Sequence, residues 1–127
     1  MPMMRARILV VDDEEKIRKV IAAALGSSHD VELAADGIEG LAKARRLHPD
    51  LILLDLQMPG LHGLTVLAKL KAGSRTSTIP VIVVSVQGET ESLLECQHAG
   101  AVDQVIKPFQ VENLRRIVQR QLSLLGR

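Results

Sequence analysis

The stretch LILLDLQMPG, residues 51–60, runs from four apolar residues into a single carboxylate and then into a turn. An unbroken apolar run of this length is typical of a strand covered on both faces, as in a parallel sheet between two layers of helices. Pro59 has no N–H to donate and Gly60 permits a turn, so regular structure should stop there. We therefore expect Asp55 at the carboxyl end of a central strand, where open α/β sheets bind their ligands.

Four further strand-like stretches lie before and after this one, and a helical pattern follows each strand. The expected strands cover residues 8–11, 31–35, 80–85 and 101–106. The apolar positions of the five expected helices are, in chain order, Ile17, Val20, Ile21, Ala24 and Leu25; Ile38, Leu41, Ala42 and Leu47; Leu64, Leu67 and Leu70; Leu93, Leu94 and Cys96; and Val111, Leu114, Ile117, Val118, Leu122 and Leu125. The fourth helix, about residues 89–98, has the weakest apolar stripe, so we expect it to be the least firmly docked.

Five strands that alternate with five helices indicate one α/β domain over residues 1–127. Parallel strands need crossover helices, and right-handed crossovers place those helices on both faces of the sheet. A flavodoxin-like (βα)5 sheet of strand order 2-1-3-4-5 is common for such a chain, and its crevice lies between strands 1 and 3. The sequence therefore predicts this fold, with Asp55 beside the crevice.

Composition argues against several other classes of protein. The net charge is +1, so we expect no direct binding of nucleic acid by this domain. Phe109 is the only aromatic residue, which leaves no platform on which bases stack. Cys96, the only cysteine, cannot form an internal disulfide, and we expect it to fill space in the core. Without a secretory signal or a run of roughly 20 apolar residues, we expect a cytoplasmic protein with no membrane contact.

Polar residues end or follow four of the five expected strands. They are Asp12 and Asp13, Asp55, Ser85 and Lys107. Each alone has an ordinary explanation, as a helix cap, a solvated turn carboxylate, a strand-end hydroxyl or a surface lysine. Under the 2-1-3-4-5 order, however, all of them lie at one edge of the sheet. We therefore favour a functional cluster over four independent ordinary explanations.

Three carboxylates in one place repel each other unless a cation lies among them or some are protonated. Oxygen ligands without histidine or cysteine favour Mg²⁺ or Mn²⁺ over zinc. In such a site Asp55 can act as a nucleophile that forms an aspartyl phosphate. The cation and Lys107 would offset charge on the phosphoryl oxygens, and Ser85 would donate a hydrogen bond to one of them.

Taken together, four segments resemble the receiver domain of bacterial two-component response regulators over essentially the full length of the chain. The segments are Val10–Glu14, Leu53–Gly60 with Gly63, Val83–Ser85, and Lys107–Phe109. The resemblance implies that Asp55 accepts a phosphoryl group from a phosphohistidine on a sensor histidine kinase or a phosphotransfer protein. It also implies a two-state switch that regulates an output domain or partner.

The same resemblance implies a set of metal ligands. Asp13 and Asp55 would bind Mg²⁺ directly together with the backbone carbonyl of Gln57, and Asp12 would help through water. Gln57 also lies two residues after the acceptor, at a position that tunes dephosphorylation in the family. We expect Gln57 to lengthen the lifetime of the phosphoryl group.

By the resemblance, Ser85 is the switch hydroxyl and Lys107 the partner of the phosphoryl group, with a cis peptide bond before Pro108. The chain departs from the usual pattern at two nearby positions. Gln104 stands where receivers usually carry Tyr or Phe, so coupling through a moving ring is not expected. Val86 follows Ser85 where a small residue is usual, and its branched side chain should narrow access to the site and slow loss of the phosphoryl group.

Two other classes of protein fit parts of the pattern. Phosphatases of the haloacid-dehalogenase type also form an aspartyl phosphate on an α/β sheet, but they carry a second Asp where this chain has Gln57. We therefore expect no enzyme beyond self-catalysed phosphorylation and slow dephosphorylation. A binding module with the same fold and no phosphorylation is the other alternative, and the intact set of acids, hydroxyl and lysine speaks against it. A flavin site is a poorer fit, because the chain has no Gly-rich phosphate loop.

Opposite charges mark the last two expected helices. The acidic residues of the fourth are Glu89, Glu91 and Glu95, and the basic residues of the fifth are Arg115, Arg116, Arg120 and Arg127. Ordinary solvated faces explain this distribution, and we favour that interpretation. The alternative is a homodimer through these two helices, because a symmetric contact needs both signs on one patch.

Overall fold

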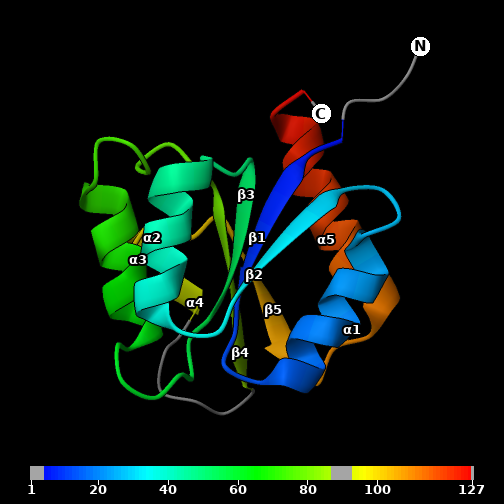
Figure 1. Ribbon diagram of the computed structural model, residues 1–127, viewed down its shortest axis with the longest axis horizontal. Helices are drawn as coiled ribbons and strands as arrows, with labels where there is room; N and C mark the ends of the chain where they lie inside the picture. The colour runs from blue at the N-terminus through cyan, green and yellow to red at the C-terminus, as the bar shows by residue number, and fades with distance from the viewer. Residues whose placement is uncertain (1–4, 87–92, 127) are drawn as a thin grey trace.

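The computed structural model describes residues 5–86 and 93–126. Within them, five parallel strands form one sheet in the order β2-β1-β3-β4-β5 (Figure 1). The strands are β1 (Arg7–Val11), β2 (Asp30–Ala34), β3 (Leu51–Asp55), β4 (Val81–Val86) and β5 (Asp103–Lys107). The helices are α1 (Glu15–Leu25), α2 (Gly37–Leu47), α3 (Gly63–Ala72), α4 (Leu93–His98) and α5 (Val111–Leu124). The predicted flavodoxin-like fold and strand order are confirmed.

The sheet lies between two layers of helices. α1 and α5 cover one face, and α2, α3 and α4 cover the other (Figure 1). Successive residues of β3 point to opposite layers: Leu54 belongs to the core beneath α2 and α3, and Leu53 to the core beneath α1 and α5. Because helices cover both faces, β3 has no solvated side, and this explains its unbroken apolar run.

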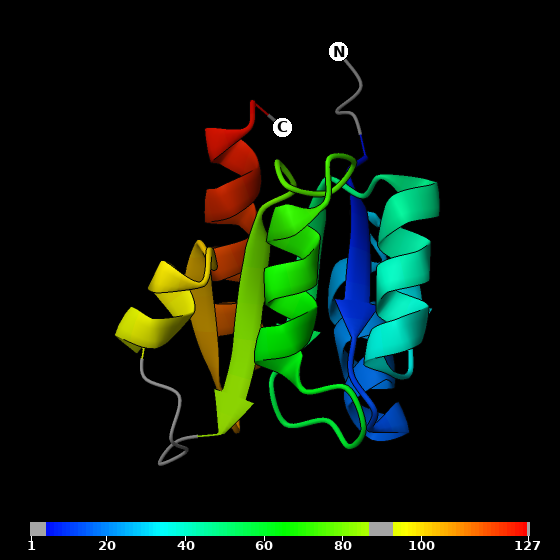
Figure 2. The same ribbon diagram turned by 90° about the vertical axis from the view of Figure 1, so that its left-hand side faces the viewer.

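The carboxyl ends of the five strands share one edge of the sheet, where the arrowheads in Figure 2 point. Asp55 pairs with Val84, the neighbour of Ser85, and Lys107 pairs with Val86. The polar residues that end or follow the strands are therefore brought to the same edge, as the strand order predicts.

Two glycines shape the loop between β3 and α3. Gly60 has a φ of 79°, a left-handed backbone conformation that other residues rarely adopt. Gly63 lies so close to β3 that a Cβ there would stand 2.5 Å from Leu56 Cα and 2.7 Å from the carbonyl oxygen of Asp55. The missing side chain thus lets α3 begin directly against the backbone that carries Asp55.

The face through which α2 docks agrees with the prediction only in part, since Leu41 is buried as predicted. Ile38 is 73% exposed and Ala42 is also exposed, so their predicted places in the apolar face are wrong. The buried residues of α2 are Gly37, Gly40, Leu41 and Ala44. At Gly40 a Cβ would lie 2.8 Å from a methyl group of Val11, so small residues bring this helix close to β1. A search for large apolar residues at helical spacing finds Leu41 but misses the glycine and alanine residues that pack beside it.

The last two helices agree with the prediction in part. α4 is described from Leu93 onward, and residues 89–92 of the predicted helix lie outside the described ranges. Its Cys96 is fully buried, as predicted. Leu125 lies just past the end of α5 and is 46% exposed, so its predicted place in the apolar stripe is wrong. Among the helices described, none is long and apolar enough to cross a membrane.

Candidate functional site

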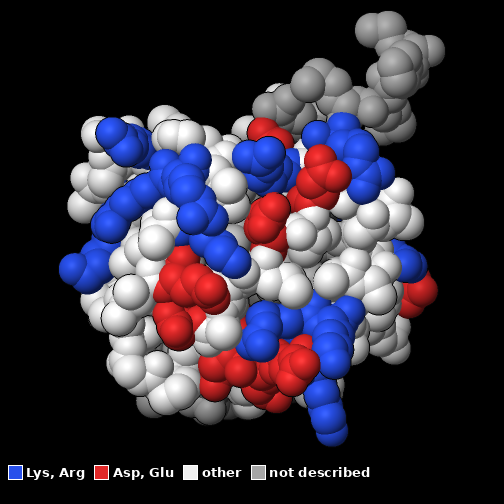
Figure 3. Space-filling model, viewed as in Figure 1, with Lys and Arg blue, Asp and Glu red and all other residues white. Residues whose placement is uncertain are grey.

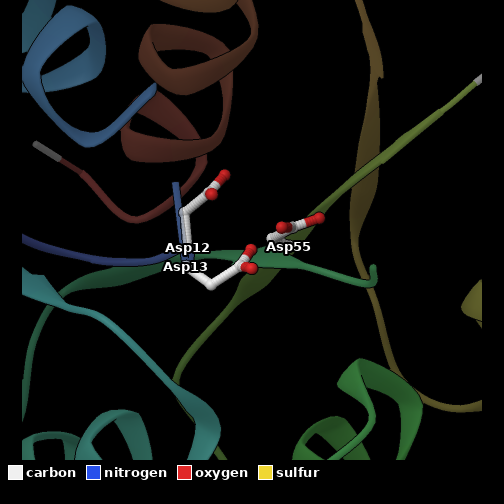
Figure 4. Close-up of side chains that lie close together, drawn as sticks. All are labelled: Asp12, Asp13 and Asp55. Atoms are coloured by element: carbon white, nitrogen blue, oxygen red, sulfur yellow. The ribbon is translucent and has the colours of Figure 1, made fainter. Parts of the chain in front are cut away.

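Three aspartates meet at the carboxyl edge of the sheet. Asp12 and Asp13 directly follow β1, and Asp55 is the last residue of β3, its neighbour in the sheet (Figure 4). One carboxylate oxygen from each of them lies within 4.8 Å of the other two. Asp12 and Asp55 are each only 1% exposed, whereas Asp13 is more open to solvent. The pairing of two strands far apart in the sequence has thus concentrated negative charge in a largely buried place.

The backbone that follows each strand fixes the orientation of its buried aspartate. Asp12 Oδ1 accepts a hydrogen bond from the Glu14 N–H at 2.9 Å, and Asp55 Oδ1 accepts one from the Gln57 N–H at 3.0 Å. Both are local turns in which a carboxylate caps the N–H two residues ahead. Each aspartate therefore uses one oxygen to hold its turn and keeps Oδ2 for contacts across the site.

Lys107, the last residue of β5, supplies positive charge to this cluster. Its Nζ lies 3.1 Å from Asp12 Oδ2, 3.4 Å from Asp55 Oδ2 and 3.7 Å from Glu14 Oε1. The lysine side chain is 11% exposed and both aspartates are buried, so solvent screens the two aspartate pairs little, whereas the Glu14 side chain is 61% exposed. The peptide bond between Lys107 and Pro108 is cis, as the resemblance implied.

Burial and charged neighbours shift the pKa values of both Asp55 and Lys107. Burial raises the pKa of Asp55 to about 6, and the charge of Asp12 adds to this, although the Gln57 N–H and Lys107 act in the opposite direction. Burial alone would lower the pKa of Lys107, but the Asp12 hydrogen bond and the charges of Asp55, Asp12 and Glu14 outweigh it, and the net pKa is raised. One ammonium is thus shared among several carboxylates and does not neutralise them.

This arrangement fits a bound divalent cation. Asp55 Oδ2 is buried, and among the described residues it accepts no hydrogen bond, since its contact with Lys107 is an ion pair at 3.4 Å. The donor set consists of carboxylate oxygens, which Mg²⁺ and Mn²⁺ prefer. Oxygens on opposite sides of one Mg²⁺ lie roughly 4 Å apart, so small side-chain rotations would bring all three aspartates to a single ion.

Ser85 reaches the same edge but has a different partner. Its side chain is 1% exposed, and its Oγ accepts a hydrogen bond from Gln104 Nε2 at 2.6 Å. The structure therefore brings the aspartates and Lys107 into direct contact and places Ser85 beside them, bonded to a residue of β5. The sequence marked Gln104 as unusual, but it did not reveal this bond.

A family model of the response regulator receiver domain matches residues 8–119. The chain belongs to this family. The curated DNA-binding dual master transcriptional regulator RpaA of Synechocystis sp. is 39% identical over 95% of this chain, and the regulatory protein AtoC of Escherichia coli is 36% identical over 93% of it. These matches cover 51% of RpaA and 25% of AtoC, so the chain spans about half or less of the length of these relatives.

Solved receiver structures have the same fold. The chemotaxis protein CheY4 of Vibrio cholerae superposes with a TM-score of 0.85 at 32% identity, covering 92% of this chain and 98% of that one. The receiver domain of NtrX from Brucella abortus superposes with a TM-score of 0.84 at 34% identity, covering 91% and 98%. The family that the four sequence segments indicated is confirmed, and the module is a signalling domain rather than a classical enzyme.

In this receiver domain, Gln57 connects the loop after β3 to the end of β4. Its side-chain Oε1 accepts a hydrogen bond from the Val86 N–H at 3.1 Å. Its Nε2 is buried, and no residue in the described part of the chain accepts a hydrogen bond from it. The Val86 side chain is 40% exposed at the rim of the edge. The sequence placed both residues near the acceptor, and the contact between them is new.

Two features of the surroundings were not predicted. A groove of about 450 Å³ opens beside the site, and its lining residues are Glu14, Ile17, Val20, Val86, Lys107, Pro108 and Phe109. His62, an exposed residue directly before α3, is the N-cap of that helix, and its Nδ1 accepts a hydrogen bond from the Leu64 N–H at 3.1 Å. Histidine is not among the usual capping residues, so the capping rules gave no signal for it.

Proposed function

We propose that this receiver domain is a phosphorylation-dependent switch in which Asp55 accepts a phosphoryl group from a sensor histidine kinase or a histidine phosphotransfer protein. The observation that carries the proposal is the position of Asp55 Oδ2, which is buried, accepts no hydrogen bond within the described residues and lies 3.4 Å from Lys107 Nζ. The family match and the neighbouring carboxylates support the same assignment.

The proposed chemistry is a transfer between two side chains. An Asp55 oxygen attacks phosphorus, an O–P bond forms as the P–N bond of phosphohistidine breaks, and the imidazole leaves with the electron pair. Because the pKa of Asp55 is about 6, the nucleophile is mostly ionised above pH 7. Lys107 stabilises charge on the phosphoryl oxygens.

We propose that the site would hold Mg²⁺ or Mn²⁺. The direct ligands would be Asp13, Asp55 and the backbone carbonyl of Gln57, and Asp12 would help through water. When bound, this ion would supply further positive charge where negative charge gathers on the transferring group. It would also offset the repulsion among the carboxylates, which adds to burial in raising the pKa of Asp55.

The proposed switch follows from the charge that phosphorylation adds. A phosphoryl group brings about −1.5 to −2 charges and three strong acceptor oxygens. Ser85 and Lys107 are the donors that we assign to those oxygens, and an arrangement in which both reach them is favoured once Asp55 is modified. A change from 1:99 to 99:1 needs about 5.5 kcal/mol, within the range of a few charge-assisted hydrogen bonds.

Turnover of phosphate esters is not part of the proposal. A dehalogenase-type phosphatase needs a second carboxylate near the nucleophile as an acid and base, and Gln57 has a neutral amide that bonds to the Val86 N–H. Our proposal is therefore limited to self-catalysed phosphorylation and slow dephosphorylation. A binding module without phosphorylation is not favoured, because it would not require buried carboxylates held next to Lys107.

The partners that we propose are a phosphohistidine donor and an unidentified output domain or protein, in the cytoplasm. We also propose that this domain does not bind nucleic acid directly. Acidic and basic side chains are interspersed on the face that Figure 3 shows, and this agrees with that proposal.

A homodimer through α4 and α5 stays a prediction. Arg120 already forms an ion pair with Asp103, and Arg115 one with Glu112, so part of the basic charge of α5 is used within the chain. Light scattering with beryllofluoride, a phosphoryl mimic, tests it: a doubled mass is expected for the dimer, and a monomer mass would contradict it.

The function is tested by incubating the protein with acetyl phosphate and Mg²⁺ and measuring its intact mass. Wild type should gain one phosphoryl group, and Asp55→Asn should gain none. Asp36→Asn is the matched control, because Asp36 is exposed and an asparagine still caps α2 there. Phosphoryl incorporation in Asp55→Asn would show that the acceptor lies elsewhere.

A further inference from the structure

The residue of most interest outside the charged cluster is Gln104 on β5. Its Nε2 donates a hydrogen bond of 2.6 Å to Ser85 Oγ, and within the described residues this is the only hydrogen bond of that hydroxyl. Ser85 is 1% exposed, so water does not readily replace the amide. Gln104 is thus a hydrogen-bond donor to the hydroxyl of the proposed switch.

The strand register explains why Gln104 reaches Ser85. Gln104 pairs with Val83, and Ser85 is two residues further along β4. Residues two apart in a strand share a face, so Ser85 is the diagonal neighbour of Gln104 on that face. The long side chain of Gln104 spans this diagonal gap, as its hydrogen bond to Ser85 Oγ shows.

The direction of the bond decides what the hydroxyl can still do. A serine hydroxyl has one proton to donate and two lone pairs to accept with. Because Ser85 accepts from Gln104, its own proton is left for another acceptor. The phosphoryl oxygens that we propose on Asp55 are acceptors of this kind, and Asp55 pairs with Val84, next to Ser85.

The backbone beside Ser85 is held by a separate contact. Gln57 Oε1 accepts from the Val86 N–H at 3.1 Å, and β4 pairs with β3 on one side and with β5 on the other. Loss of the Gln104 amide therefore frees the hydroxyl of Ser85 without freeing the end of β4.

We propose that Gln104 is a positioning residue, which holds the Ser85 oxygen as an acceptor and so directs the hydroxyl proton toward a phosphoryl group on Asp55. The inference rests on the proposed function of Asp55. Through this bond β5 senses the phosphoryl group by a polar contact in place of a ring. Val102 and Ile106, two residues to either side of Gln104, are 42% and 39% exposed, so Gln104 lies on a partly exposed face of this segment.

A double-mutant cycle tests the proposal. Gln104→Met keeps the length of the side chain and removes its hydrogen bond, and Ser85→Ala removes the hydroxyl. The rate of phosphorylation by acetyl phosphate with Mg²⁺ is followed by intact mass for wild type, both single variants and the double variant. Gln104→Met should slow the reaction roughly 2- to 10-fold, the range of one hydrogen bond. The double variant should react at the rate of Ser85→Ala alone, whereas rates that multiply, or an unchanged rate for Gln104→Met, would overturn the proposal.

A second substitution at Gln104 distinguishes an effect of its hydrogen bond to Ser85 from an effect of side-chain packing. Gln104→Glu has nearly the shape of glutamine, but its carboxylate only accepts, so it takes the Ser85 proton away from the phosphoryl group. Its rate should fall below that of Gln104→Met, and the difference should shrink when Ser85→Ala is also present. Because repulsion by the new charge does not need the hydroxyl, a difference of equal size in both backgrounds would overturn the inference.

Two further measurements distinguish a failure of the role of Gln104 from a loss of folded protein and from a failure of the proposed function. Urea unfolding should give free energies for Gln104→Met and Ser85→Ala within about 1.5 kcal/mol of wild type, so that slower reaction reflects the site and not a loss of folded protein. Failure of wild type to gain a phosphoryl group, or gain by Asp55→Asn, would contradict the proposed function itself. Normal phosphorylation of wild type together with rates that multiply would contradict only the role of Gln104.

Discussion

The two halves of the sheet edge are built from different chemistry. Around β1 and β3 the polar side chains are carboxylates joined by Lys107, and two of the three aspartates are almost fully buried. At the end of β4 they are neutral, since the Gln104 amide donates a hydrogen bond to the Ser85 hydroxyl and the Gln57 amide oxygen accepts one from the Val86 N–H. Charge in a buried place is costly unless it is balanced, whereas neutral hydrogen bonds exchange partners at small cost. We infer that the first half determines whether a phosphoryl group and a cation bind, and that the second determines how the protein responds and for how long.

The largest expected effect is in the charged half, at Lys107. Lys107→Met leaves buried carboxylates without their cation, so in buffer with EDTA the free energy of unfolding should fall by roughly 3 kcal/mol. Urea unfolding at pH 7.5 measures it. Lys19→Met is the control, because the Lys19 pair with Glu15 is exposed on both sides and should contribute less than about 1 kcal/mol. Equal losses of unfolding free energy in the two variants would show that the buried charges of the Lys107 cluster are no more important for stability than an exposed ion pair.

Asp55→Asn should stabilise the metal-free protein at neutral pH. Burial is the main cause that raises the pKa of Asp55 to about 6, so the folded form holds this proton more tightly than the unfolded form. Wild type therefore loses stability as the pH rises from about 4 to about 6. The asparagine variant has no such loss, and it should be more stable than wild type by about 2–3 kcal/mol at pH 7.5 and nearly equal to it at pH 3.5. Urea unfolding in EDTA at both pH values measures this, and a difference independent of pH would contradict it.

In the neutral half, Gln57→Ala and Val86→Ala should change the lifetime of the phosphoryl group more than the free energy of unfolding. Both residues lie at the rim beside the acceptor, and their mutual hydrogen bond closes the loop after β3 against β4. Gln57→Ala removes this hydrogen bond, whereas Val86→Ala keeps its backbone N–H but removes the branched side chain at the rim. Both changes admit water, so each variant should lose its phosphoryl group faster, by roughly 2- to 10-fold. Decay is followed by intact mass after removal of acetyl phosphate. Unchanged decay in both variants would show that neither residue tunes the lifetime.

The smallest effect is expected away from both halves, at Ile38. Since this side chain is 73% exposed, Ile38→Gln should change the free energy of unfolding by less than about 0.5 kcal/mol. Leu41→Ala, on the buried face of the same helix, should cost about 2–5 kcal/mol. Urea unfolding compares them, and similar losses would mean that Ile38 is docked as well as Leu41.

Much of the fold was predictable because its signals are local in the sequence. The apolar run that ends at Asp55 indicates a strand covered on both faces, and alternation with helices then fixes a parallel sheet. Once the strand order is known, Asp12, Asp13, Asp55 and Lys107 must share an edge, so the charged cluster follows without coordinates. The faces of individual helices were less predictable, because α2 packs through Gly40 and Ala44, whose small side chains carry no periodic apolar signal.

What the sequence did not provide depends on geometry between strands. The bond between Gln104 and Ser85 requires the register of β4 and β5, which no short motif specifies. The raised pKa of Asp55 arises from burial, which depends on how closely the layers pack. Motif comparison marked Gln104 as a departure, and only the structure connected that departure with the hydroxyl beside the acceptor.

The central claim is tested most directly by locating the phosphoryl group. Protein treated with acetyl phosphate is reduced with borohydride, which converts an aspartyl phosphate to homoserine, and its peptides are sequenced by mass spectrometry. We predict conversion at Asp55 alone, dependent on Mg²⁺ or Mn²⁺ and abolished by EDTA. Conversion at Asp12 or Asp13, or modification that continues without a divalent ion, would contradict the account.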